Sequence, residues 1–564
     1  MLGLRAAIAT AALAFLLAAC APASGVGTLR FRNQPIVWQI NDRMDVPKKP
    51  EERKYARTLY HVDGFVVRRL TRKMEFREPS RAANINAVDE VPDSTWFHNR
   101  IGMRELSVEE VRRGPNMDEG PENYKPWTIT SSKVGGTAVG FIMEDGRGIK
   151  YLLKFDDKKG PEVETAADVI VQRILWAAGY NVPEDSIVYF RREDLVLAAD
   201  ASKKDVFGTK TPMTVSDLEE SLAEVDVLPD GSYRGLASKY LSGIPIGPYA
   251  REGVRKDDPN DRIPHELRRE LRGQYPIFAW LNHTDLQEDN TLDMWAEDPR
   301  DPKKHYVMHY LVDFGKALGV MGYFNHWTWI GYAHRVDFSF MSRSFLTLGL
   351  WKRPWEDIST PPIRGLGLYE VDSYEPGSWK ANSPYWPLKD KDRFDAFWGA
   401  KILIRFTPEH LRAVVTEAKY SDPRAAEYMV RALIARQRKT ARYWFQQVNP
   451  LDRFEVKAEQ NGHSLCFDDL MVQYELDDIA AIVTEYRGEA FDYAGQPTGW
   501  SARAKPGQRG RTCLKGIVPA ANRDGYTIVR IVTQRGGRDL PATLVHLAKT
   551  PNAETLRIIG LRRQ

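Results

Sequence analysis

Two short stretches decide how this chain is understood: residues 283–290 read His-Thr-Asp-Leu-Gln-Glu-Asp-Asn, and residues 312–315 read Val-Asp-Phe-Gly. The first stretch carries the carboxylate of Asp285 and the amide of Asn290, and the second adds the carboxylate of Asp313. Carboxylate and amide oxygens are the ligands that hard divalent cations such as Mg²⁺ prefer. Asp285, Asn290 and Asp313 are therefore candidates for a catalytic or metal-binding site.

The residues before these stretches predict a β-rich unit. Residues 127–130, 141–144 and 149–155 read as strands separated by turns that contain glycine. Gly135, Gly136 and Gly140 in the first turn can let backbone N–H groups approach phosphate oxygens, because glycine lacks a Cβ. Their spacing is not G-x-G-x-x-G, and glycines in a hairpin commonly serve only the turn, so both interpretations stay open.

Lys154 ends the apolar strand 151–154, and residues 162–178 follow it with helical periodicity. Gly179 is placed to end that helix. Further along, residues 265–281 predict a helix that leads into residue 283, and residues 291–295 and 306–312 predict a hairpin that returns the chain to Asp313.

Residues from about 127 to 445 resemble the protein-kinase-like superfamily, most nearly its atypical branches, the HipA-type and secretory-pathway kinases. The resemblance lies in H-x-D-L-x-x-x-N at 283–290, D-F-G at 313–315, and a lysine at the end of an apolar strand. It implies an α+β, bilobal core, with a β-rich N-lobe at 126–245 and a mainly helical C-lobe at 246–448.

The resemblance also implies roles for individual residues. Asp285 and His283 are expected at the catalytic position, and Asn290 and Asp313 are expected to hold Mg²⁺ or Mn²⁺. ATP is the expected phosphoryl donor, and its phosphates would contact Lys154 and the backbone at Gly135, Gly136 and Gly140. Glu164 is expected to orient Lys154, with Glu162 and Asp168 as alternatives.

Two departures from the kinase pattern limit what the resemblance implies. Thr284 stands where many kinases have the arginine that reads a phosphorylated activation loop, and no Ala-Pro-Glu string follows Asp313. The acceptor therefore stays open between a protein, a lipid, a glycan and a small molecule.

The N-terminus has the pattern of an export signal. Arg5 precedes an apolar stretch at 6–17, and residues 17–20 read Leu-Ala-Ala-Cys. The ending resembles a bacterial lipobox, so residues 1–20 predict a lipoprotein signal peptide with Cys20 as the lipidated residue; an ordinary secretory signal with a chance cysteine is the alternative. Ala21 instead of Asp implies the outer membrane. Residues 21–125 would form a tether and an N-terminal extension.

Residues 449–564 predict a β-sandwich-like domain, because short alternating segments are separated by turns such as Asn461-Gly462. Cys466 and Cys513 are the only cysteines besides Cys20, and an exported chain favours a disulfide between them. Two separately buried thiols are the alternative.

Composition narrows the function classes. A hydrophobic fraction of 43% is that of a packed globular protein, and a formal net charge of +4 over 564 residues gives no reason to expect a nucleic-acid partner. The expected partners are a nucleotide, an unknown acceptor, and a membrane through the lipid anchor.

Several activities fit these residues. The leading hypothesis is an exported phosphotransferase, and AMP transfer by the same site is an alternative. A non-catalytic envelope lipoprotein, with the kinase-like core as a scaffold, is another. A metallohydrolase using His283, His305 and His309 is the last, although their spacing matches no zinc motif.

Overall fold

The computed structural model describes residues 25–75, 80–133, 139–204, 209–551 and 553–564. The chain divides into two compact units. The larger, called the core unit here, takes in residues 38–84 and 91–444. The other, the C-terminal unit, joins residues 445–564 to the described residues up to Val37 and to residues 85–90. Both helices and sheets are present, so the predicted α+β composition is confirmed.

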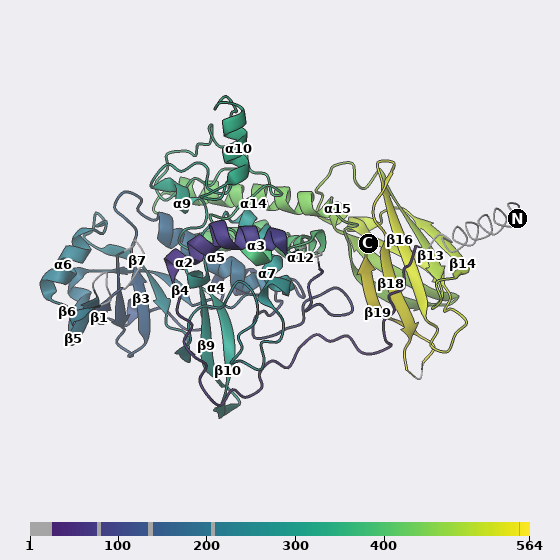
Figure 1. Ribbon diagram of the computed structural model, residues 1–564, viewed down its shortest axis with the longest axis horizontal. Helices are drawn as coiled ribbons and strands as arrows, with labels where there is room; N and C mark the ends of the chain where they lie inside the picture. The colour runs from purple at the N-terminus through teal and green to yellow at the C-terminus, as the bar shows by residue number, and fades with distance from the viewer. Residues whose placement is uncertain (1–24, 76–79, 134–138, 205–208, 552) are drawn as a thin grey trace, which may run out of the picture. The chain divides into compact units, whose positions relative to one another are not determined.

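A seven-stranded sheet forms the first part of the core unit (Figure 1). In sheet order its strands are β4 (Asp185–Phe190), β7 (Tyr233–Lys239), β3 (Lys150–Lys154), β2 (Gly140–Glu144), β1 (Trp127–Ser132), β5 (Leu195–Lys204) and β6 (Lys210–Pro212). Alternate side chains of the central strands are buried, among them Trp127, Phe141 and Leu153. Burying one side of each strand fixes the register, since a shift by one residue would expose this whole set.

Helix α5 (Val163–Ala178) lies next to this sheet, where Val169 packs with Ile187 of β4 and Leu236 of β7. The helix ends at Gly179, whose φ of 129° disfavours other residues. Helix α6 (Val215–Ala223) starts with Thr214 as its N-cap and packs Leu218 and Leu222 into the same core as the sheet. Helix α5 is therefore packed against β4 and β7, and β7 is the neighbour of β3 in the sheet.

The predicted helix over 265–281 is broken into three pieces. They are a 3₁₀ turn (His265–Leu267), α7 (Arg269–Arg272) and α8 (Gln274–Trp280). Arg268 is extended between the first two, with φ −82° and ψ 126°. Gly273 separates the others where the chain passes so close to Trp398 that a Cβ would lie 2.5 Å from that ring. The extended backbone of Arg268 is thus the clear departure from the predicted helix.

Strands β8 (Ile244–Pro245), β9 (Thr291–Asp298) and β10 (Asp301–Leu311) form a second, three-stranded sheet in the core unit. Residues 283–290 connect α8 to β9, and residues 313–315 follow β10. The antiparallel pair β9–β10 aligns Thr291 with Leu311, and so brings the two stretches together.

The rest of the core unit is helical. Its helices are α2 (Arg57–Val62), a π-helical turn (Asp63–Val67), α3 (Arg68–Met74), α4 (Val108–Arg113), α9 (Val320–Tyr323), α10 (Phe338–Leu346), α11 (Trp386–Lys389), α12 (Arg393–Leu403), α13 (Pro408–Thr416) and α14 (Pro423–Phe445). The basic stretch 436–442 of α14 is not simply the solvated face that its charges suggest. Arg436 is buried and donates to the carbonyl oxygens of Ala279 and Glu370 at 2.8 and 2.7 Å. No helix among the described residues is long and apolar enough to cross a membrane.

The C-terminal unit is built mainly of two sheets. One has the order β11 (Leu451–Glu459), β12 (Gly462–Asp469) and β15 (Arg511–Ile517). The other contains β14 (Pro497–Ala504), β13 (Thr484–Phe491), β16 (Thr527–Arg535), β18 (Thr543–Lys549) and β19 (Leu556–Arg563), with β17 (Arg538–Asp539) paired to β16. Leu465, Tyr486 and Val545 share its buried core. Residues 470–473 form the short helix α15 (Leu470–Gln473), and the side chain of Asp469 caps it by accepting the N–H of Met471.

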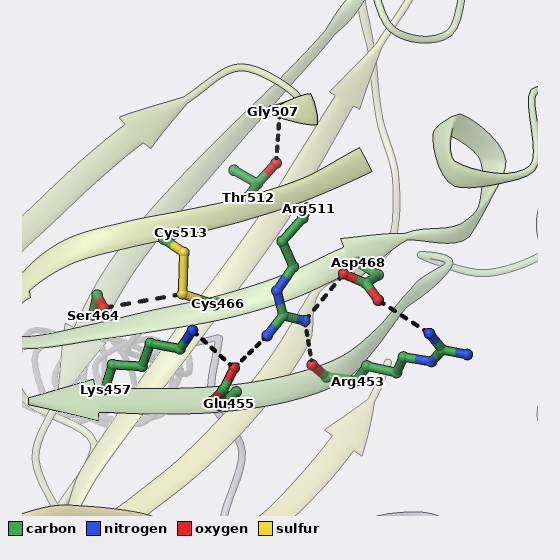
Figure 2. Close-up of a disulfide and its surroundings, with 10 residues drawn as sticks. All are labelled: Arg453, Glu455, Lys457, Ser464, Cys466, Asp468, Gly507, Arg511, Thr512 and Cys513. Carbon is green, nitrogen blue, oxygen red and sulfur yellow. Dashed lines mark hydrogen bonds and ion pairs between the residues drawn. A yellow bond between two sulfur atoms is a disulfide. The ribbon is translucent and has the colours of Figure 1, made fainter. Parts of the chain in front are cut away.

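Cys466 and Cys513 form a disulfide between directly paired positions of β12 and β15 (Figure 2). Arg511 lies next to this disulfide and donates to Asp468 at 3.0 Å and to Glu455 at 2.6 Å. The bond and these ion pairs join all three strands of the smaller sheet.

Candidate active site

A lysine and two carboxylates meet where β3, α5 and residue 313 come together. The Nζ atom of Lys154, at the end of β3, lies 3.2 Å from Oδ2 of Asp168 and 3.1 Å from Oδ1 of Asp313. Lys154 is 13% exposed and Asp168 is 4% exposed, whereas Asp313 is 52% exposed. Asp168 thus holds Lys154 in a buried ion pair, whereas Asp313 presents its carboxylate to solvent.

The acidic partner of Lys154 is Asp168, which corrects the prediction of Glu164. Glu164 pairs with Lys316, and Glu162 pairs with Arg364 and accepts from Ser421. Glu164 and Asp168 are four residues apart, so both side chains lie on one face of α5. Asp168 is one turn deeper in the helix, and this turn is the one level with the end of β3.

Asp168 also fixes the backbone of the D-F-G stretch. Its Oδ2 accepts from Lys154, while its Oδ1 accepts the backbone N–H of Phe314 at 3.0 Å. Asp313 has a positive φ of 63°, a backbone conformation that residues other than glycine rarely adopt. One buried carboxylate therefore fixes both the lysine and the neighbour of the exposed carboxylate.

Charge at this site is set by burial and by opposing partners. Burial lowers the pKa of Lys154, but the carboxylates of Asp168 and Asp313 outweigh it, and the net pKa is raised. Lys154 lowers the pKa of Asp313, with further contributions from Lys133 and Lys316. Lys154 is thus a cation and Asp313 an anion at neutral pH.

Asp185, the first residue of β4, is a site neighbour that sequence reasoning missed. It is 1% exposed, and burial, with the nearby charge of Asp168, raises its pKa to about 8. An acidic residue at the start of an otherwise apolar strand is the only signal for it in the sequence. Burial thus favours the neutral form of the Asp185 carboxyl group next to Lys154 and Asp168.

The stretch 283–290 is held in shape by its own polar groups. Gln287 Nε2 donates to Oδ1 of Asp285 at 2.6 Å, and Asn290 Nδ2 donates to the carbonyl oxygen of Asp285 at 2.7 Å. The N–H of Val312 donates to the carbonyl of Asn290 at 3.0 Å, so Asn290 is adjacent to the residue before Asp313. The three predicted polar residues are thus brought to one place.

His283, which was expected at the catalytic position, is a buried residue. It is 3% exposed, and its ring meets Phe278 and Phe314 edge to face at 4.9 and 5.9 Å. Burial lowers its pKa to about 4, so the ring is neutral at pH 7. It supports Phe314 and, through it, the backbone at Asp313.

The predicted glycine loop is described only in part. Gly135 and Gly136 lie outside the described residues. Gly140 is buried in β2, where a Cβ would lie 2.4 Å from the carbonyl oxygen of Leu153, so close strand pairing accounts for this glycine. Lys133, before the undescribed residues, has its pKa lowered by burial and by Lys154. Lys133 is therefore close enough to contribute to the charge of the site.

The oxygen donors at this site suit a hard divalent cation. Asn290 uses its amide nitrogen on Asp285, so its Oδ1 is the atom that would face a metal together with the exposed carboxylate of Asp313. Burial and the charge of Asp285 raise the pKa of Asp289 to about 6, as expected where anionic oxygens crowd together. A bound cation would relieve this crowding.

The histidines of the metallohydrolase alternative do not converge. His309 pairs with Asp293 at 2.7 Å and stacks on Trp96, whereas His305 stacks on Trp295. Within the part of the chain that the structure describes, no three His, Cys, Asp or Glu side chains are grouped to hold a metal ion.

The N-terminal extension, which was expected to pack against the kinase-like core, contacts the loop that carries Asp285. Arg53 pairs with Glu288 at 2.5 Å, and Tyr55 Oη donates to Gln287 Oε1 at 3.3 Å. His61 of α2 is near enough that Asp285 acts on its pKa, which burial lowers overall. The extension thus packs against the loop that carries Asp285.

Comparison with known proteins gives one structural similarity. No family model and no curated protein matches the chain. Among solved structures, the chain is similar to the Rio2 kinase from Chaetomium thermophilum, determined as an ADP/Mg²⁺-phosphoaspartate complex. The match covers 57% of this chain and 72% of that chain, at 14% sequence identity and a TM-score of 0.22.

Proposed function

We propose that this chain is a kinase-like phosphotransferase that moves a phosphoryl group from a nucleotide to an acceptor hydroxyl. The observation that carries the proposal is the contact of Lys154 with both Asp168 and Asp313, next to a loop in which Asn290 is tied to Asp285. A fixed cation, a general base and two metal-binding oxygens are the groups that phosphoryl transfer requires.

Each residue has a defined task in this reaction. Lys154 holds donor phosphate oxygens, and Asp168 keeps its ammonium group in place. Asp285 accepts the proton of the acceptor hydroxyl as the new O–P bond forms and the bond to the nucleoside diphosphate breaks. Asn290 and Asp313 would hold Mg²⁺, which neutralises charge on the transferred group. Most of the catalysis is expected from positioning.

The electrostatics of the free site favour this assignment. Lys154 already neutralises Asp313, and Lys316 neutralises Glu164. A Mg-nucleotide would bring its own cation for Asp313 and anionic oxygens for Lys154, so every charge of the site would keep a partner on binding. This exchange predicts that nucleotide and metal bind together, not separately.

We also propose that the chain is exported and anchored at the outer membrane through a lipid on Cys20, which lies outside the described residues. The support is the sequence of residues 1–20 alone. Metabolic labelling with a radioactive fatty acid, with Cys20→Ser as the control, tests it. Label in the wild type that disappears in the variant is expected, and label in neither would overturn the anchor.

The test of the phosphotransferase is ATP binding by the full chain, by calorimetry, with and without Mg²⁺. Asp313→Ala is expected to abolish the Mg²⁺-dependent binding. Asp118→Ala is the matched control, because Asp118 is 56% exposed and pairs with Lys239 on β7, away from the site. Absence of binding for ATP, ADP and GTP would contradict the proposal and leave the scaffold alternative.

The reaction itself is tested with labelled ATP. Label transferred from the γ position supports phosphoryl transfer, whereas label transferred from the α position would show that AMP is moved instead. Asp285→Asn is expected to lower transfer by about a hundredfold or more while binding is retained, because it removes the base but not the phosphate contacts.

A further inference from the structure

Helix α10 and the turn after it present an apolar tip to solvent. In Figure 1, α10 stands out from the rest of the core unit. Phe345 and Leu346 are each 79% exposed, and Leu348 and Leu350 are each 88% exposed. Surface side chains of this size are ordinary when they are scattered, but four within six positions need an explanation.

The tip is a folded turn with paired backbone groups. The N–H of Gly349 donates to the carbonyl of Ser344 at 2.8 Å, and the N–H of Leu350 donates to Thr347 at 2.9 Å. Leu348 and Gly349 have positive φ values of 50° and 80°, which close the turn and direct the chain back. Satisfied backbone groups lower the cost of placing such a tip in an apolar medium.

A set of aromatic side chains lies just behind the tip. The ring of Phe340 is 5.3 Å from Trp351 and 5.2 Å from Trp355, and Arg343 lies over Trp351 at 4.4 Å. Trp351 and Trp355 are half-buried. Half-buried tryptophans beside basic residues are typical of groups at the level of lipid headgroups.

A second apolar surface continues from the base of α10. Helices α2 and α3, with the π-helical turn between them, expose one stripe of aliphatic side chains: Leu59, Val62, Val66, Val67, Leu70 and Met74, exposed by 70, 51, 50, 49, 56 and 72%. Arg69 of α3 donates to the carbonyl of Val336 at 3.0 Å and lies over the ring of Phe338. The stripe and the tip are therefore connected through Arg69.

The charges beside these apolar surfaces are mainly positive. Helices α2 and α3 and the turn between them carry five basic residues against the one acid Asp63, namely Arg57, Arg68, Arg69, Arg72 and Lys73. Of these, Arg68 and Arg72 are paired with Glu75, Glu252 and Asp390. Arg57 and Lys73 are exposed, as are Arg343 and Arg353 beside the tip. An apolar stripe with basic flanks is complementary to a bilayer that contains anionic lipids.

We propose that this surface docks on an anionic phospholipid bilayer, with the 345–350 tip in the boundary between headgroups and acyl chains and the α2–α3 stripe along the surface. This contact is independent of any lipid on Cys20. A convex tip needs a shape-matched pocket on a protein partner, whereas a fluid bilayer adapts to it. The orientation would hold the core unit in a fixed position against the membrane.

The test uses the full chain with Cys20→Ser, so that no lipid anchor contributes, and measures flotation with vesicles. Vesicles of phosphatidylcholine with one part in four of phosphatidylglycerol are compared with pure phosphatidylcholine. Binding to the anionic vesicles, weakened by salt, is expected. The triple variant Phe345→Ser, Leu348→Ser, Leu350→Ser is expected to bind about tenfold or more weakly, since three buried apolar side chains are lost.

The matched control is Ile479→Ser with Ile482→Ser, which removes two apolar side chains 55 and 79% exposed in the C-terminal unit. It is expected to bind as the parent chain does. Unchanged thermal unfolding of each variant, expected for exposed positions, shows that folding is intact.

Three results would overturn the proposal. They are no flotation with anionic vesicles, equal binding by the triple variant, and a concentration-dependent dimer that the triple variant abolishes while vesicles do not bind. The last result would assign the tip to an interface between two copies of the chain. None of these results depends on whether the site around Lys154 is active.

Discussion

Lys154 of β3 and Asp168 of α5 form a buried ion pair at 3.2 Å, and the same aspartate holds the N–H of Phe314. Asp168→Asn keeps the size of the side chain but removes its charge. We expect it to lower the affinity for Mg-ATP by about tenfold to a hundredfold, the value of a charge-assisted hydrogen bond. Calorimetric titration measures this effect.

Glu164→Gln is the control for that experiment, because Glu164 lies one turn earlier on the same helix face and pairs with Lys316. Its effect on affinity is expected to be clearly smaller than that of Asp168→Asn. A larger effect of Glu164→Gln would mean that Glu164, not Asp168, serves Lys154 when nucleotide is bound.

The disulfide between Cys466 and Cys513 closes a loop of 47 residues. Reducing it is expected to destabilise the C-terminal unit by about 4 kcal/mol, from the entropy that the unfolded chain regains. Thermal unfolding with and without a reductant measures this. Cys466→Ala with Cys513→Ala should show the lower stability without reductant, and equal stability of both forms would contradict the expectation.

The buried cluster of Arg269, Arg272 and Asp395 is expected to be sensitive to loss of charge. The Nε atom of Arg269 donates to Asp395 at 3.0 Å, and both side chains are 0% exposed. Asp395→Ala leaves buried guanidinium groups without their anion and should cost about 3–5 kcal/mol in the free energy of unfolding. Urea denaturation measures it.

Glu427→Gln provides the contrast, since Glu427 and Arg431 form an exposed pair on α14. Its loss is expected to change stability by less than about 0.5 kcal/mol. Equal effects of Asp395→Ala and Glu427→Gln on the free energy of unfolding would show that burial does not explain the importance of the pair of Arg269 and Asp395.

His546 of β18 predicts how the C-terminal unit responds to acid. Burial lowers its pKa to about 3, with smaller contributions from Arg30 and Arg562, and its Nδ1 contacts Tyr526 Oη at 2.9 Å. The unfolded chain protonates this histidine near pH 6.5, but the folded unit does not. Stability is therefore complete above about pH 6.5 and is lost as the pH falls from there toward 3.

The difference between pH 7 and pH 5 is expected to be up to about 2 kcal/mol for this one group. His546→Gln cannot take up the proton and should lose less stability over the same range. Chemical denaturation of the wild type and the variant at both pH values measures the difference. Equal losses in the two proteins would exclude His546 as the cause.

The local sequence was sufficient to predict the strands and helices in which apolar residues recur at a regular interval. It was also sufficient to predict polar residues that stand at a characteristic spacing. Strands β1 to β3 and helix α5 lie close to their predicted positions, because alternation and helical periodicity are read from neighbouring residues. Asp285, Asn290 and Asp313 were predicted from the resemblance of their two stretches to kinase motifs, and the hairpin of β9 and β10 joins these stretches. Such features depend on contacts that are near in sequence.

Tertiary structure decided the rest. Several acids near the start of α5 were candidates for Lys154, and only the depth of α5 against β3 selects Asp168 over Glu164. The helix predicted over 265–281 is interrupted at Arg268, whose backbone is extended in the folded chain. The extension at Arg53 meets Glu288 across more than 200 residues. Long-range packing leaves no periodic signal in the sequence, so these relationships become visible only in the folded chain.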